Sequence, residues 1–151
     1  MAYREGKHVK SRAKLGFAVK DIIDNMPGAF IVYRADKEND EILLANNELL
    51  RLTGCKNMDE LLAYTGKSFC NLIRRDELES CQKSIWSQID GGNVNDYSFF
   101  HMRKADGTYI SVLDHGRIVD SVRNGRVFYV MIMDLNALQR HYGDCLELVE
   151  K

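Results

Sequence analysis

The chain has 151 residues, of which 45% are apolar and 28% charged, and its formal net charge is −1 at pH 7. This length fits one domain with one hydrophobic core. The balanced charge excludes a general attraction to nucleic acid or to membranes. Basic residues predominate only near the N-terminus, and we interpret residues 1–14 as a solvated basic tail because no aromatic platform for nucleic acid accompanies them.

Several functional classes lack their sequence signals. No apolar run reaches the ~18 residues of a membrane span, and no signal peptide opens the chain. We find no zinc-protease, hydrolase, phosphate-loop or dinucleotide motif, so we expect no catalytic residues and no metal. The cysteines show no CxxC spacing and indicate reduced thiols in a cytoplasmic protein. These cysteines are Cys55, Cys70, Cys81 and Cys145.

The first predicted elements are a helix and two strands. Apolar residues recur at helical spacing over residues 15–26, and Pro27-Gly28 ends this flanking helix. Apolar runs then predict strands over residues 29–34 and 41–45, separated by a polar loop.

Three helices are predicted next. Asn46 is an N-cap candidate for a helix over residues 47–53 that stops at Gly54. Asn57, with a glutamate three residues later, predicts a helix ending at Ala63. Asp76 and Glu79 form the same pattern and predict the start of the longest central helix, which Gly91-Gly92 terminates.

The final part of the predicted domain is an antiparallel meander over residues 97–103, 109–113 and 126–133. Its turns are Asp106-Gly107 and Asn124-Gly125. Two strands before the helices and three after them predict an α+β domain with one five-stranded antiparallel sheet and helices on one face. A helix over residues 135–151 follows.

The order of these segments resembles the PAS domain family over roughly residues 20–136. The matching segments are residues 26–30, 45–47, 52–54, 66–69, 76 and 103–108, and Asp134-Leu135-Asn136 stands where the family often has Asp-Ile-Thr. The resemblance implies a cytoplasmic sensory or dimerisation module over residues 15–134, attached to an output domain such as a diguanylate cyclase or a histidine kinase.

Departures from the family argue against two cofactors. The flavin-binding branch needs a cysteine in an Asn-Cys-Arg-Phe-Leu-Gln segment, and Phe69 stands at that position, with Cys70 one residue later. Haem-binding members supply a histidine from the long helix, and residues 76–90 contain none. We therefore expect no flavin and no haem, and either a filled core or a cavity for an unidentified small ligand.

The family's strand register predicts which side chains point inward. Those that would line a pocket are Tyr33, Leu49, Phe69, Ile73, Phe100, Met102, Ile110, Val112, Val130 and Ile132. The opposite sheet face is also apolar and should be covered, because a bare apolar face of this size would be sticky. We expect the flanking helix and a second copy of the chain to cover it together. The predicted dimer contacts are Phe30, Val32, Phe99 and Tyr129.

The C-terminal helix is the predicted output route. Asp134, Leu135 and Asn136 join the last strand to it, and Asp134 is an N-cap candidate that would set the exit angle. Its apolar residues follow an a/d spacing for about two heptads, so both a short coiled coil and a helix docked on its own domain remain open.

Two functional hypotheses follow. The first is a regulatory sensor or dimerisation module. The second is a small enzyme of ketosteroid-isomerase-like type that would use a buried carboxylate of raised pKa, and Asp114 is the candidate.

Overall fold

A computed structural model describes the backbone of residues 16–150 and the side chains of residues 16–145. The predicted basic tail, residues 1–14, lies outside the described residues. The elements are α1 (Val19–Asp24), β1 (Ala29–Arg34), β2 (Ile42–Ala45), α2 (Asn47–Thr53), α3 (Met58–Thr65), the 3₁₀ turns η1 (Phe69–Leu72) and η2 (Arg75–Glu77), α4 (Leu78–Asp90), β3 (Asn95–Arg103), β4 (Tyr109–Ser121), β5 (Gly125–Asp134) and α5 (Leu135–Glu150).

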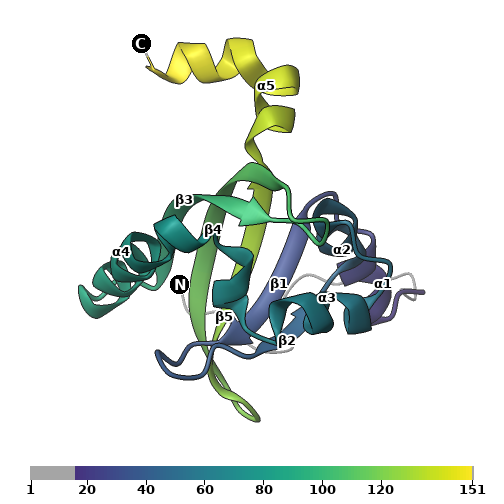
Figure 1. The fold of residues 1–151 in the computed structure, drawn as a ribbon, viewed down its shortest axis with the longest axis vertical. Helices are drawn as coiled ribbons and strands as arrows, with labels where there is room; N and C mark the ends of the chain where they lie inside the picture. Colours follow the sequence, from purple (N-terminus) through teal and green to yellow (C-terminus); the bar gives the residue numbers. More distant parts are fainter. Residues whose placement is uncertain (1–15, 151) are drawn as a thin grey trace.

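The strands form one five-stranded sheet in the order β2-β1-β5-β4-β3, with every neighbouring pair antiparallel. The helices α2, α3 and α4 lie on one face of the sheet, and α5 leads away from its end (Figure 1). The predicted α+β class and the two-plus-three arrangement of strands are therefore confirmed. The first and last strands of the domain are neighbours: β1 pairs with β5, and Ile31 lies opposite Val130.

The meander is longer than predicted. We expected the fourth strand to end at residue 113, but β4 continues to Ser121, and β3 begins at Asn95. The polar stretch from Asp114 to Arg117 interrupts the apolar alternation that marks a strand in the sequence. Pairing with β3 on one side and β5 on the other keeps this stretch extended, because tertiary context overrides local propensity.

The caps explain where two of the helices begin and end. Asn46 Oδ1 accepts a hydrogen bond from Leu49 N at 3.0 Å, and Gly54, with φ +80°, ends α2 as predicted. Asn57 caps α3 through Glu60 N at 2.9 Å, but α3 runs past Ala63 to Thr65 because the left-handed residue that stops it is Gly66.

The predicted capping role of Asp76 is wrong. The helix α4 begins at Leu78, after a 3₁₀ turn, and no side chain caps it. Asp76 Oδ1 instead accepts a hydrogen bond from Arg74 Nε at 2.6 Å. The competing ion pair therefore removes the carboxylate from the helix end.

The flanking helix is also shorter than the predicted residues 15–26. Ala18 is extended (φ −84°, ψ 160°), so α1 begins at Val19, and it ends at Asp24 before the chain reaches Pro27. It lies beside α2 (Figure 1), where Asn46 Nδ2 donates to Ile23 O at 3.0 Å. Our expectation that it covers the outer sheet face is wrong, since Tyr97, Phe99 and Tyr129 on that face stay exposed.

The core lies between the sheet and the helices α2 to α4. The rings of Tyr33 and Phe69 stack with centroids 3.9 Å apart, and Phe100 meets Phe69 edge-on at 6.3 Å. Trp86 of α4 packs edge-on against Phe128 of β5 at 5.6 Å. Burial of each large apolar side chain contributes roughly 1.5–3 kcal/mol, so this cluster holds the helices on the sheet.

Candidate functional site

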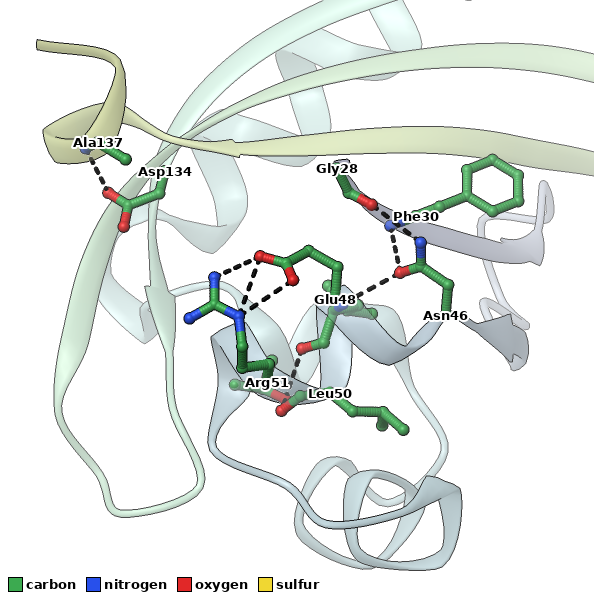
Figure 2. Close-up of polar contacts among 10 residues, drawn as sticks. Gly28, Phe30, Asn46, Glu48, Leu50, Arg51, Asp134 and Ala137 are labelled. Carbon is green, nitrogen blue, oxygen red and sulfur yellow. Dashed lines mark hydrogen bonds and ion pairs between the residues drawn. The ribbon is translucent and has the colours of Figure 1, made fainter. Parts of the chain in front are cut away.

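The junction between the sheet and α5 is held by Asp134. This residue ends β5, and its Oδ1 atom accepts hydrogen bonds from Asn136 N at 2.9 Å and Ala137 N at 3.2 Å. Figure 2 shows the bond to Ala137 at the first turn of α5. A carboxylate at this position satisfies free backbone N–H groups of the helix and so stabilises the first turn of α5.

A cleft of about 300 Å³ adjoins this junction. Arg51 and Glu48 of α2 contribute to its wall, with Asp134 and the first turns of α5 opposite. Arg51 Nε donates to both carboxylate oxygens of Glu48, at 3.1 and 3.0 Å (Figure 2). The hydrogen bond and charge of Glu48, and then the charge of Asp134, raise the pKa of Arg51. The sequence did not identify Arg51, because its relation to Asp134 exists only in the folded sheet.

Asn46 does more than cap α2. Its Oδ1 atom accepts from Phe30 N at 2.9 Å as well as from Leu49 N, and its Nδ2 atom donates to Gly28 O at 2.9 Å (Figure 2). With the bond to Ile23 O, this fully buried amide connects α1, β1 and α2. The entrance of β1, beside the end of β5, is therefore held by one side chain.

The predicted pocket residues face the space between the sheet and the helices. Nine of these ten residues are buried and Ile110 is half-buried. Phe69, Phe100, Leu49 and Met102 are 0% exposed. Aromatic rings fill much of this space, so any ligand among these residues would be small.

The residues at the family's cofactor positions do not fit flavin or haem. Phe69, at the position of the flavin-reactive cysteine, is stacked on Tyr33 in the core. Burial, with a contribution from Asp40, raises the pKa of the neighbouring Cys70 thiol to about 12, so this thiol stays protonated. The helix α4 carries no histidine to ligate haem iron. We therefore assign neither group to this chain.

Asp96 and Asp114 form a buried acidic pair, of which the sequence analysis identified only Asp114. They are 1% and 2% exposed. Burial raises the pKa of Asp96 to about 6. Burial and then the charge of Asp96 raise the pKa of Asp114 well above its ordinary value. Asp114 thus has the burial and raised pKa that the enzyme hypothesis required. Asp96 was missed because it lies before the predicted start of its strand.

The outer face of the sheet carries exposed aromatic side chains. The exposed fractions are 60% for Tyr97, 50% for Phe99, 46% for Tyr109 and 45% for Tyr129. The other predicted contacts, Phe30 and Val32, are half-buried on the same face, and Phe30 packs edge-on against Tyr129 at 5.8 Å. A soluble protein rarely leaves a contiguous apolar patch bare, so this face is a candidate interface.

Two further findings concern the described residues. Within this part of the chain, no group of three or more His, Cys, Asp or Glu side chains is arranged to hold a metal ion. None of the helices that the structure describes is long and apolar enough to cross a bilayer.

Comparisons with known proteins agree with this architecture. A family model described as "PAS domain" matches residues 19–88. A search of the curated proteins found no match. Among solved structures, the LOV protein of Rhodobacter sphaeroides is 19% identical, with a TM-score of 0.62, and the match covers 77% of this chain and 64% of that protein. This chain thus spans about two thirds of that relative's length.

Two other structures are single PAS domains. One, from a LuxR-family transcriptional regulator of Burkholderia thailandensis in complex with ethanol, is 20% identical with a TM-score of 0.61, covering 80% of this chain and 99% of that one. The other, from a two-component sensor histidine kinase, is 16% identical with a TM-score of 0.58, covering 76% and 91%. At these identities the likeness shows the fold.

The sheet order and the helices on one face define an α+β domain with the fold of the PAS structures above. The family match over α1 to α4 completes the identification. Residues 19–88 are thus identified as part of a PAS domain by sequence, and the rest of the domain shares the fold of solved PAS structures.

Proposed function

We propose that this chain senses a small ligand or a change of state in its core and passes the signal through α5 to an attached output domain, a diguanylate cyclase or a histidine kinase. The signal junction is Asp134, Leu135 and Asn136. The proposed location is the cytoplasm, supported by the four cysteines, all free, which suit a reducing compartment.

The observation that carries this proposal is the cap at Asp134. One carboxylate joins the end of β5 to the first backbone N–H groups of α5. Two residues earlier in the same strand, Ile132 lies in the core, 2% exposed. A change in the core therefore reaches the helix along a few residues of one strand. Such a change acts on an output domain only if the junction has two arrangements and the signal alters the free-energy difference between them.

The test uses the full-length protein and measures output with and without its stimulus. Asp134→Ala should reduce stability by about 0.5–2 kcal/mol and uncouple output from the stimulus. Asp134→Asn keeps an acceptor oxygen and should preserve coupling.

Asn57→Ala is the matched control for this test. It removes a comparable N-cap from α3, far along the chain from α5. It should reduce stability by a similar amount and leave regulation intact. Regulation that survives Asp134→Ala, or is lost equally in Asn57→Ala, would contradict the proposed route.

We further propose that two copies associate through the outer sheet face. Its aromatic residues are exposed, and α1 lies elsewhere, with Val19 and Ile22 themselves 73% and 55% exposed. Burial of each large side chain would contribute roughly 1.5–3 kcal/mol to association.

Sedimentation tests this interface. Phe99→Asp or Val32→Asp should convert a dimer to a monomer, while Val122→Asp, in the β4–β5 turn, should not, although Val122 is also an exposed apolar residue. A folded Phe99→Asp protein that keeps the wild-type mass would refute the interface.

One observation supports the enzyme hypothesis: Asp114 is buried and its pKa is raised. PAS domains act as sensory modules, and the family match therefore favours regulation. Turnover of an enolisable ketone that is lost in Asp114→Asn would favour the enzyme instead.

A further inference from the structure

Two carboxylates lie in the interior, and most of their oxygens lack a hydrogen-bond partner. Three of their four oxygens, Asp96 Oδ1 and both oxygens of Asp114, accept no hydrogen bond. Neither residue takes part in any ion pair among the described residues. Buried polar groups in proteins are nearly always hydrogen-bonded, and an unpaired carboxylate is among the most costly exceptions. The pair therefore calls for a functional explanation.

The strand register brings these carboxylates to one place on the helix-covered face. Asp96 lies opposite Gly116, and Asp114 lies opposite Ser98. The two acidic residues are thus diagonal neighbours on adjacent strands, within reach of one small ligand. A Cβ atom at Gly116 would stand 2.4 Å from Asp96 Oδ1, so only glycine leaves room for this carboxylate.

A surface cleft lies beside Ser98, the residue opposite Asp114 in the β3–β4 register. It has a volume of about 310 Å³ and lies between α4 and β3. The lining residues are Glu77, Ser80, Cys81, Ser84, Tyr97, Ser98 and Phe99. Cys81 Sγ of α4 and Ser98 Oγ of β3, 3.9 Å apart, both line the cleft. Burial raises the pKa of Cys81 to about 11, and the nearby charge of Asp114 adds to this effect.

The charge and the free acceptor oxygens of the site determine the chemical class of its ligand. The free oxygens are hydrogen-bond acceptors, and ionised carboxylates would repel an anion. The described residues provide no third His, Cys, Asp or Glu to complete a metal site. A ligand with several N–H donors and one positive charge would satisfy the orphaned oxygens and offset the cost of burying their charge.

We propose that Asp96 and Asp114 bind a small organic cation, with a primary ammonium or amidinium group, that enters between α4 and β3. This inference rests on the proposed sensory function and names the class of its signal. In the absence of ligand, protons neutralise the pair. Binding the cation therefore releases protons, and affinity should rise with pH.

Calorimetric titration of the wild-type protein tests the class of ligand. The probes are ethylammonium and acetamidinium, with ethanol as the neutral isostere of ethylammonium and acetate as the anion. We expect both cations to bind, ethanol and acetate not to bind, and the dissociation constant to fall by up to tenfold per pH unit between pH 6 and 8. The measured heat should also depend on the ionisation enthalpy of the buffer, which reports the proton released.

Variants test the location. Asp114→Asn should weaken cation binding at least tenfold and remove the proton release, and Asp96→Asn should weaken it too. Asp120→Asn removes an exposed carboxylate from the same strand and should bind like the wild type. Asn is uncharged and similar in shape, so these variants should stay folded, as circular dichroism will verify.

Failure of this site is distinguishable from failure of the sensory proposal. Absence of cation binding, equal binding of ethanol, or unchanged binding in both Asp114→Asn and Asp96→Asn would overturn the site. If the cap variant Asp134→Ala still uncouples output in that case, the sensory function stands with another signal. If the cations bind and Asp134→Ala changes nothing, the site stands and the proposed route is wrong.

Discussion

Asp96 should make the folded protein less stable as the pH rises through the weakly acidic range. Its ordinary pKa is 3.8, and burial raises the folded-state value to about 6. Above pH 4 the folded state therefore binds more protons at this site than the unfolded state. The free energy of unfolding then falls with increasing pH, because its slope follows the difference in bound protons.

The magnitude follows from the two pKa values. Each pKa unit corresponds to about 1.4 kcal/mol, so Asp96 should remove roughly 3 kcal/mol of stability in total, of which about 2.5 kcal/mol is lost between pH 4 and pH 7. The contribution is fully present below the unfolded-state pKa and is lost as the pH passes the folded-state value. Asp114 acts in the same direction, since its pKa is also raised.

Urea denaturation of the wild type and Asp96→Asn from pH 4 to pH 8 isolates this effect. Titrating groups away from the pair, such as Glu77 beside His101, are common to both proteins and cancel in the difference. Asp114 does not cancel fully, because the charge of Asp96 contributes to its raised pKa. We expect the variant to gain about 2.5 kcal/mol relative to the wild type between pH 4 and pH 7. Asp120→Asn, an exposed carboxylate, should show a constant difference. A difference between Asp96→Asn and wild type that does not change with pH would refute the conclusion that burial raises the pKa of Asp96.

Two stability predictions follow from close contacts in the interior. Gly116→Ala should reduce the free energy of unfolding by about 1–3 kcal/mol, because its methyl group would overlap the Asp96 carboxylate. The loss should be smaller in an Asp96→Ala background, and equal losses in a urea-denaturation double-mutant cycle would count against the contact. Asn46→Ala should reduce stability by about 2 kcal/mol or more, because it removes a helix cap and leaves the part-buried groups Gly28 O and Phe30 N without this partner. A loss below about 0.5 kcal/mol, the lower limit for an N-cap alone, would show that the hydrogen bonds of the Asn46 side chain do not stabilise the fold.

The local sequence determined most of the elements. Turn glycines, cap residues and alternating apolar positions predicted β1 from residue 29 to 34, α2 from residue 47 to 53 and both hairpin turns. These features depend on neighbouring residues and on backbone preferences that any copy of the same short segment would share. The inward register of the core residues was predictable for the same reason, because side chains alternate strictly along a strand.

Only the tertiary structure decided the rest. The second half of β4 is polar in sequence and is extended because two neighbouring strands pair with it. Asp76 satisfies a capping pattern but pairs with Arg74, since a nearby guanidinium competes for its carboxylate. Asp96 and Asp114 are 18 positions apart in the chain and become neighbours through the β3–β4 register. Their missing partners are a property of the packed interior, because burial and pairing depend on residues that are distant in sequence.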